Sequence, residues 1–264
     1  MMKVNNTALF FIPLFIICVS CKKLPKQEET EIVPPDETGL KKVLLPVKLK
    51  SDKLTLTLDY QPGTALLTKI SSTDKSHILI TYKPTYYRVE RFKDNVLYHY
   101  ADFILSDKRA TKVHSFDSFG RVDVPTGNYM LSYNTVGQLV NIKDYNAANE
   151  FILESVMSYS ALGNLSELKL TDQQGKASVV EYSYDNKNGI FKNVLHSQLL
   201  FLETAYPIFS PASNNWLSCK NTKIPNAQIT YSYLYNIDDY PSRMVIEDTT
   251  GKQTFDITYA ELSN

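Results

Sequence analysis

The chain has 264 residues, with 28 basic and 28 acidic side chains. This balanced charge gives no electrostatic basis for binding nucleic acid, so nucleic acid is not an expected partner. Aromatic residues make up 12% of the chain, and 18 of them are Tyr against one Trp, a composition that favours β structure.

The first residues form an export signal. Lys3 is followed by an apolar run, residues 8–19, that is shorter than the roughly 20 residues of a transmembrane helix and is typical of a signal peptide. The run ends in Cys18-Val19-Ser20-Cys21, which resembles the lipobox of bacterial lipoproteins, although Cys18 stands where Leu is usual. We therefore expect residues 1–20 to be removed and Cys21 to carry the lipid, such as palmitate. The alternative is an ordinary signal peptide that is cut elsewhere.

The next segment, residues 21–47, reads as a tether. It contains Pro25, Pro34, Pro35 and Pro46 with several Glu and Asp residues, and it has few large apolar residues to bury. We expect residues 48–264 to form one domain. The resulting prediction is an envelope protein anchored in the outer membrane through Cys21, on its periplasmic face or at the cell surface.

The domain alternates apolar and polar residues with a period of two, which is typical of half-buried antiparallel strands. An example is the set Leu54, Leu56 and Leu58, with Thr55 and Thr57 between them. Residues 148–157 and 194–202 could each form a few helical turns, and a strand is at least as consistent with the pattern at 148–157. Further strands are expected at residues 77–82, 86–92, 96–105, 129–133, 177–184, 228–235, 243–247 and 253–259.

A recurring turn connects these runs. Its pattern is an aromatic residue, then Asn, Asp or Ser, two free positions, Gly, one free position and an aliphatic residue. The Asn or Asp side chain caps such a turn and the Gly supplies its positive φ. The spacing predicts a repeated hairpin of roughly 25 residues. Copies lie at 116–122, 133–139 and 159–165, looser ones at 184–190 and 235–241, and a second turn, Asp-x-x-Gly-Lys, at 172–176 and 248–252.

These patterns predict an all-β fold, an antiparallel meander of repeated hairpins that forms a strongly curved sheet or an open barrel. The exception lies near residues 198–227, where Pro207, Pro211 and Pro225 interrupt the pattern. An irregular or short helical insertion is expected there, packed over one end of the sheet.

The repeats, seen best in Tyr182-Ser183-Tyr184-Asp185, resemble the YD-repeat style of bacterial surface proteins. The wider arrangement is similar to a family of uncharacterised Bacteroidota lipoproteins with a porin-like β fold, most closely over residues 214–245. This resemblance implies fold and lipoprotein status but no activity. The strands show no continuous lipid-facing apolar band, so the resemblance does not imply a pore.

No catalytic residues, cofactor or metal site are predicted. His99 and His114 could lie on neighbouring strands as metal ligands, but the four His residues show no ligand spacing. The acids at Asp172, Asp238 and Asp239 stand at turn positions. Cys219, the one thiol left in the domain, is either a nucleophile or, more commonly, a packed side chain.

Aromatic residues outside the repeat are the candidate ligand contacts. Tyr206, Phe209 and Trp216 could stack on a sugar ring, and the alternative is that they pack over the end of the sheet. We expect a non-catalytic module that binds a glycan or an envelope protein partner. The alternatives are a surface glycan hydrolase and a purely structural envelope protein.

Overall fold

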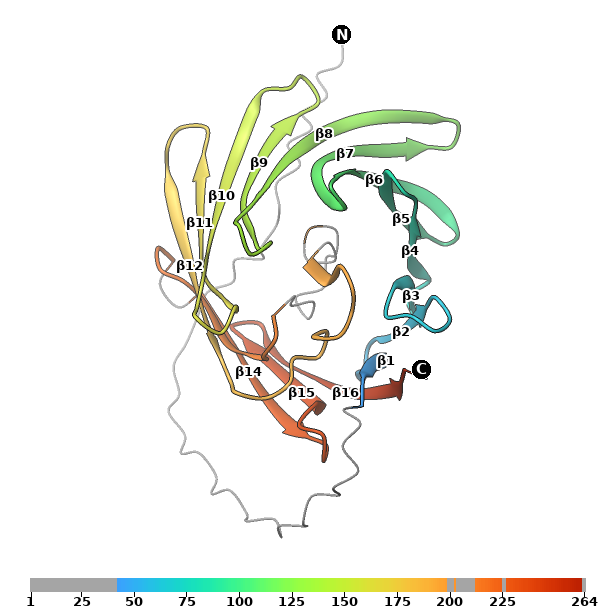
Figure 1. Cartoon of the computed structure of the whole chain (residues 1–264), viewed down its shortest axis with the longest axis vertical. Coiled ribbons are helices and arrows are strands. Elements are labelled where there is room, and N and C mark those ends of the chain that lie inside the picture. The colour runs from blue at the N-terminus through green and yellow to red at the C-terminus, as the bar shows by residue number, and fades with distance from the viewer. Residues whose placement is uncertain (1–41, 199–201, 203–211, 225–226, 263–264) are drawn as a thin grey trace.

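The computed structural model describes residues 42–198, 202, 212–224 and 227–262 (Figure 1). Residues 1–41, with the expected signal peptide, Cys21 and most of the tether, lie outside this range, as do Tyr206 and Phe209. The first strand begins at Leu44, so the expected boundary between residues 47 and 48 falls inside a strand. No helix among the described residues is long and apolar enough to cross a membrane.

Sixteen antiparallel strands form one closed barrel. Each strand pairs with its neighbours in chain order, and β1 closes the ring on β16 over six residue pairs from Leu44–Glu261 to Lys50–Asp256 (Figure 1). The strands are β1 (Leu44–Lys50), β2 (Thr55–Tyr60), β3 (Leu67–Ser72), β4 (Ser76–Tyr82), β5 (Tyr86–Lys93), β6 (Val96–Ser106), β7 (Arg109–Phe119), β8 (Val122–Tyr133), β9 (Leu139–Asn146), β10 (Phe151–Tyr159), β11 (Leu165–Asp172), β12 (Ala177–Tyr184), β13 (Trp216–Asn221), β14 (Gln228–Tyr235), β15 (Pro241–Asp248) and β16 (Gly251–Glu261).

Two sequence-based expectations about this fold are wrong. The sheet is a closed barrel rather than an open one, because the last strand returns to pair with the first. The bounds expected for the insertion, 198–227, are also wrong, since β13 lies within that region. All sixteen named elements of the described chain are strands, and helical backbone among the described residues is confined to Ser197, Gln198 and Leu202.

The barrel interior is apolar. Alternate residues of each strand point inward and pack into one cluster, in which Leu49, Phe103 and Val113 are fully buried. The outward positions carry charges that pair across neighbouring strands, as in the bidentate Arg88–Asp102 contact at 2.7 Å. Similar outward pairs are Lys143–Glu154, Arg243–Asp256 and Lys252–Glu247. The exterior therefore carries paired charges at these positions.

The repeated turn adopts the geometry that its sequence predicts. Asn134 Oδ1 accepts hydrogen bonds from the backbone N–H groups of Val136 and Gln138, and Gly137 has φ +88°. In the copy that lacks Gly, Asp239 takes the positive φ of +61° instead. The copies at 133–139, 159–165, 184–190 and 235–241 all lie where an even-numbered strand ends, and so on one rim of the barrel. The copy at 116–122 lies on the opposite rim.

Tyrosines that face the lumen link neighbouring strands by hydrogen bonds near the rim where the even-numbered strands end. Five of them donate their hydroxyl to a backbone carbonyl of the preceding strand: Tyr60 to Pro46, Tyr82 to Leu67, Tyr133 to Ala110, Tyr159 to Leu139 and Tyr233 to Trp216. Most of these carbonyls or hydroxyls stand beside a register shift, where an extra residue interrupts the ladder. The hydroxyl thus satisfies an acceptor close to where the regular pairing is broken, and the high Tyr content has a structural role.

Candidate functional site

A segment between β12 and β13 enters the barrel lumen (Figure 1). We call its described parts, residues 185–198 and 212–215, the plug. Phe191, with 1% of its surface exposed, and the buried Val194 belong to the barrel core. The Leu195 N–H donates to the Ala65 carbonyl at 3.0 Å, beside β3. The plug therefore crosses the lumen from β12 and β13 to the strands that start the chain.

Asp185 links the two described parts of the plug, residues 185–198 and 212–215, by hydrogen bonds. Its carboxylate accepts hydrogen bonds from the backbone and side-chain N–H groups of Asn215, both at 3.0 Å. It also accepts the backbone N–H of Lys187 at 3.0 Å and the hydroxyl of Tyr235. Farther along, Asn193 donates to the Leu44 carbonyl and to the Tyr240 hydroxyl. Side-chain hydrogen bonds thus fix the plug at both its ends.

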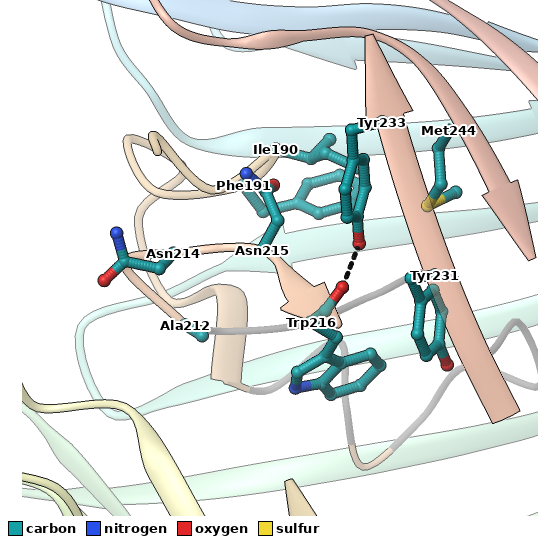
Figure 2. A pocket seen from close by; sticks show the side chains of 9 residues that line it. All are labelled: Ile190, Phe191, Ala212, Asn214, Asn215, Trp216, Tyr231, Tyr233 and Met244. Atoms are coloured by element: carbon teal, nitrogen blue, oxygen red, sulfur yellow. Dashed lines mark hydrogen bonds between the residues drawn. The ribbon is translucent and has the colours of Figure 1, made fainter. Parts of the chain in front are cut away.

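Trp216 lies in the core beside the plug, as Figure 2 shows. Only 7% of its surface is exposed, and its ring packs 5.6 Å from the rings of Tyr182 and Tyr231. Its indole N–H donates to the Tyr184 hydroxyl, and its carbonyl accepts from Tyr233. The adjoining cavity measures about 10 Å³, room for about one water molecule. This environment favours the packing alternative for Trp216 over a sugar-binding face.

A larger pocket opens at the rim where the even-numbered strands end. Its volume is about 120 Å³, compared with the ~10–15 Å³ that a single water needs. It is lined by residues of β5, β7, β8, two hairpin turns and the plug, namely Tyr87, Lys108, Arg109, Ala110, Tyr133, Gly137, His196 and Gln198. Drug-sized ligands occupy about 300 Å³ or more, so this pocket suits a small polar group or one end of a longer ligand.

The pocket carries positive charge. The Arg109 guanidinium lies 5.9 Å from the centre of the Tyr133 ring and rests against Gly137, where a Cβ would meet its Nη2 at 2.8 Å. Among the described residues, neither Lys108 nor Arg109 forms an ion pair. Burial lowers the pKa of His196, which keeps its imidazole neutral, and its Nε2 lies 3.2 Å from the Tyr87 hydroxyl. Burial also raises the pKa of Tyr133 to about 12.

His99 and His114, which the sequence suggested as possible metal ligands on neighbouring strands, face opposite sides of the sheet. β6 and β7 are neighbours, but His99 pairs with Asp117 toward the lumen, and His114 pairs with Asp102 on the outer face. His99 Nδ1 lies 2.9 Å from Asp117 Oδ1. Within the described residues, no group of three or more His, Cys, Asp or Glu side chains is arranged to hold a metal ion.

Cys219 faces the lumen between Tyr182 and Ile229, its partners on β12 and β14. Burial raises the pKa of its thiol to about 11, so the thiol is protonated at neutral pH. A protonated thiol is a poor nucleophile, which favours a packing role.

Sequence reasoning missed the rim pocket because its residues are far apart in the chain. The one local signal was Gly137, which the turn pattern marked. Tyr87, Arg109 and His196 come together through the consecutive pairing of β5, β6 and β7 and through the path of the plug.

No protein-family model matches the chain, and no curated protein matches it. Solved structures do. A porin-like protein from Bacteroides uniformis superimposes with a TM-score of 0.55 at 18% identity, covering 84% of this chain and 97% of that one. A porin-like protein from Bacteroides vulgatus gives a TM-score of 0.53 at 11% identity, covering 82% and 99%. These similarities show the fold, an antiparallel β-barrel, and the expected lipoprotein family stays a prediction.

Proposed function

We propose that the protein is exported, is anchored by lipid at Cys21 in the outer membrane, and works as a non-catalytic module that binds a glycan at the rim pocket. The observation that supports this most is a barrel with a charged exterior and a filled lumen that opens a cationic, tyrosine-lined pocket at one rim. The lipid anchor in this proposal rests on the lipobox-like sequence that ends at Cys21, and the anchored protein stands on the periplasmic face or at the cell surface.

The placement of apolar side chains in the lumen and charged side chains outside argues against a membrane-spanning pore. A spanning porin has an apolar belt toward lipid and a polar, water-filled lumen. In this barrel the lumen-facing residues form the apolar core, to which the plug adds Phe191, and the outer face carries ion pairs such as Arg88–Asp102. This arrangement supports a barrel that stands in water beside the membrane that holds its lipid.

The composition of the pocket favours binding over glycan hydrolysis. Glycosidases generally place two carboxyl groups about 5 to 9.5 Å apart across the scissile bond. The eight residues that line the rim pocket include Arg, Lys, His and Tyr but no Asp or Glu. Guanidinium and hydroxyl groups can hold sugar hydroxyls or an acidic sugar substituent, and Tyr rings can pack against a sugar face.

A glycan array tests the ligand class. The full chain, purified in a mild detergent, would be compared with Arg109→Gln and with Arg121→Gln, an exposed Arg of the β7–β8 turn on the opposite rim. We expect binding that Arg109→Gln weakens by roughly tenfold, as for the loss of one charged hydrogen bond, and that Arg121→Gln leaves unchanged. If the folded protein binds no glycan, the ligand class is wrong, and a protein partner or a structural role takes its place.

A separate experiment tests the anchor. Wild-type protein should remain with the membrane fraction and gain the mass of its acyl chains at Cys21. Cys21→Ser should lose that mass and move to the soluble fraction. Unlipidated wild-type protein would contradict the lipid anchor.

A further inference from the structure

Three hairpin tips on one rim expose large aliphatic side chains. Val136, Leu162 and Ile237 are 76%, 75% and 87% exposed. They lie in the β8–β9, β10–β11 and β14–β15 turns, and each occupies one of the two free positions of the repeated turn. A single exposed aliphatic side chain is ordinary. Here the exposure recurs at equivalent places along one rim, in side chains that add little to the core.

The opposite rim differs. Its exposed tips are mostly polar, as at Lys75, Gln174 and Thr250. The exceptions include Val96 in the β5–β6 hairpin, which is 60% exposed, and the β7–β8 hairpin, where Phe119 and Val122 face each other as a cross-strand pair. The most exposed aliphatic tips, Val136, Leu162 and Ile237, therefore lie on the first rim, which we call the aliphatic rim.

The chain enters the barrel at the aliphatic rim. β1 begins there at Leu44, and β16 ends there at Glu261, since the two strands are antiparallel neighbours. Residues 22–41 separate Cys21 from the described barrel, and twenty residues reach at most roughly 70 Å when fully extended. A lipid on Cys21 would hold this rim near the bilayer, where even weak contacts form because of the high effective concentration.

The charges on this rim suit a membrane surface. Lys108 and Arg109 stand in and beside the β6–β7 turn, and neither forms an ion pair with another described residue, while the exposed acids Asp107 and Asp238 stand on the same rim. Basic side chains close to a bilayer are attracted by anionic headgroups, and aliphatic side chains gain by leaving water for the boundary between headgroups and acyl chains.

We propose that the aliphatic rim docks on the phospholipid surface, with Val136, Leu162 and Ile237 inserted among the headgroups. The proposal rests on the lipid anchor at Cys21. It also orients the rim pocket, which opens on the same side through Arg109 and Gly137. The glycan of the proposed function would then be one that the membrane presents, such as the sugar headgroup of a glycolipid.

Depth-dependent quenching tests the docking. The lipidated full chain, in a Cys219→Ser background, would carry an environment-sensitive fluorophore at Leu162→Cys. Matched proteins would carry it at Gln174→Cys, a polar tip of the opposite rim, or at Phe119→Cys, that rim's apolar hairpin. Each would be bound to vesicles of phosphatidylethanolamine and phosphatidylglycerol with and without brominated acyl chains. Flotation with the vesicles reports the anchor, and quenching reports the docking.

We expect strong quenching at position 162 and little at 174 or 119. Adding Val136→Asn and Ile237→Asn should reduce the quenching at 162 by at least about twofold, because two of the three inserted aliphatic side chains become polar. Equal quenching at 162 and 174, or stronger quenching at 119, in protein that floats with the vesicles would overturn the docking and leave the anchor intact. Protein that fails to float with the vesicles would contradict both the docking and the lipid anchor.

Discussion

Tyr233→Phe removes one hydroxyl from the lumen, near the rim where the even-numbered strands end, and nothing else. That hydroxyl donates to the Trp216 carbonyl at 2.8 Å, across the β13–β14 pair next to the plug (Figure 2). The ring keeps its packing, so the loss is the hydrogen bond together with the desolvation penalty of a buried carbonyl, about 1–2 kcal/mol. For a domain of this size, we expect the melting temperature to fall by roughly 2–8 °C.

Tyr259→Phe is the matched control. The Tyr259 hydroxyl is buried on β16 and has no hydrogen-bond partner among the described residues. Its removal should leave the free energy of unfolding unchanged or raise it by up to about 1 kcal/mol, because an unsatisfied buried hydroxyl is lost. Urea unfolding of both full-length variants, followed by far-UV circular dichroism, measures the difference. A loss of stability in Tyr259→Phe equal to that in Tyr233→Phe would refute the assignment of the effect to the hydrogen bond.

Three other substitutions probe the core, the plug and the pocket. Burial raises the pKa of Asp144 to about 6, so the folded state binds more protons than the unfolded state between about pH 4 and 6, and stability should fall as pH rises through that window. Asp144→Asn should therefore add about 1–2 kcal/mol at pH 7, allowing for partial exposure, and flatten the melting temperature against pH. Asp185→Ala should cost roughly 2–4 kcal/mol and speed hydrogen exchange in the plug more than in the strands, and uniform exchange would contradict its role there. Gly137→Ala should cost about 1 kcal/mol at φ +88° and also weaken glycan binding by displacing Arg109, whereas Gly175→Ala, at φ +76° with open space around it, should cost the same and leave binding intact.

The local structure was predictable because its signals are local. Alternation over Leu54, Leu56 and Leu58 marked β2, and the Asn and Gly of the repeated turn marked the β8–β9 hairpin with its positive φ. Residues 151–157 of the ambiguous stretch at 148–157 belong to β10, whose backbone pairs with β9 and β11 on both sides. Several strands with irregular alternation, such as β7 and β13, were not assigned from the sequence.

The closure and the plug were not predictable because they depend on contacts between distant residues. The pairing of β1 with β16 joins residues more than 200 positions apart, and no periodic signal records it. Trp216 lay outside the repeat register and so looked like a surface aromatic, yet the lumen is where its indole finds Tyr184 as a hydrogen-bond acceptor. The rim pocket depends on the plug, which brings His196 and Gln198 to Arg109.

Closure on the final strand has a consequence for biogenesis. Until residues 251–261 are available, β1 and β15 each present an unpaired edge, and such edges recruit strands from other molecules. Since β1 forms early in the chain and its partner comes last, a nascent or truncated chain would be an aggregation hazard throughout synthesis and export. Loss of β16 alone would thus be expected to act on solubility and yield in the cell more than on any binding step.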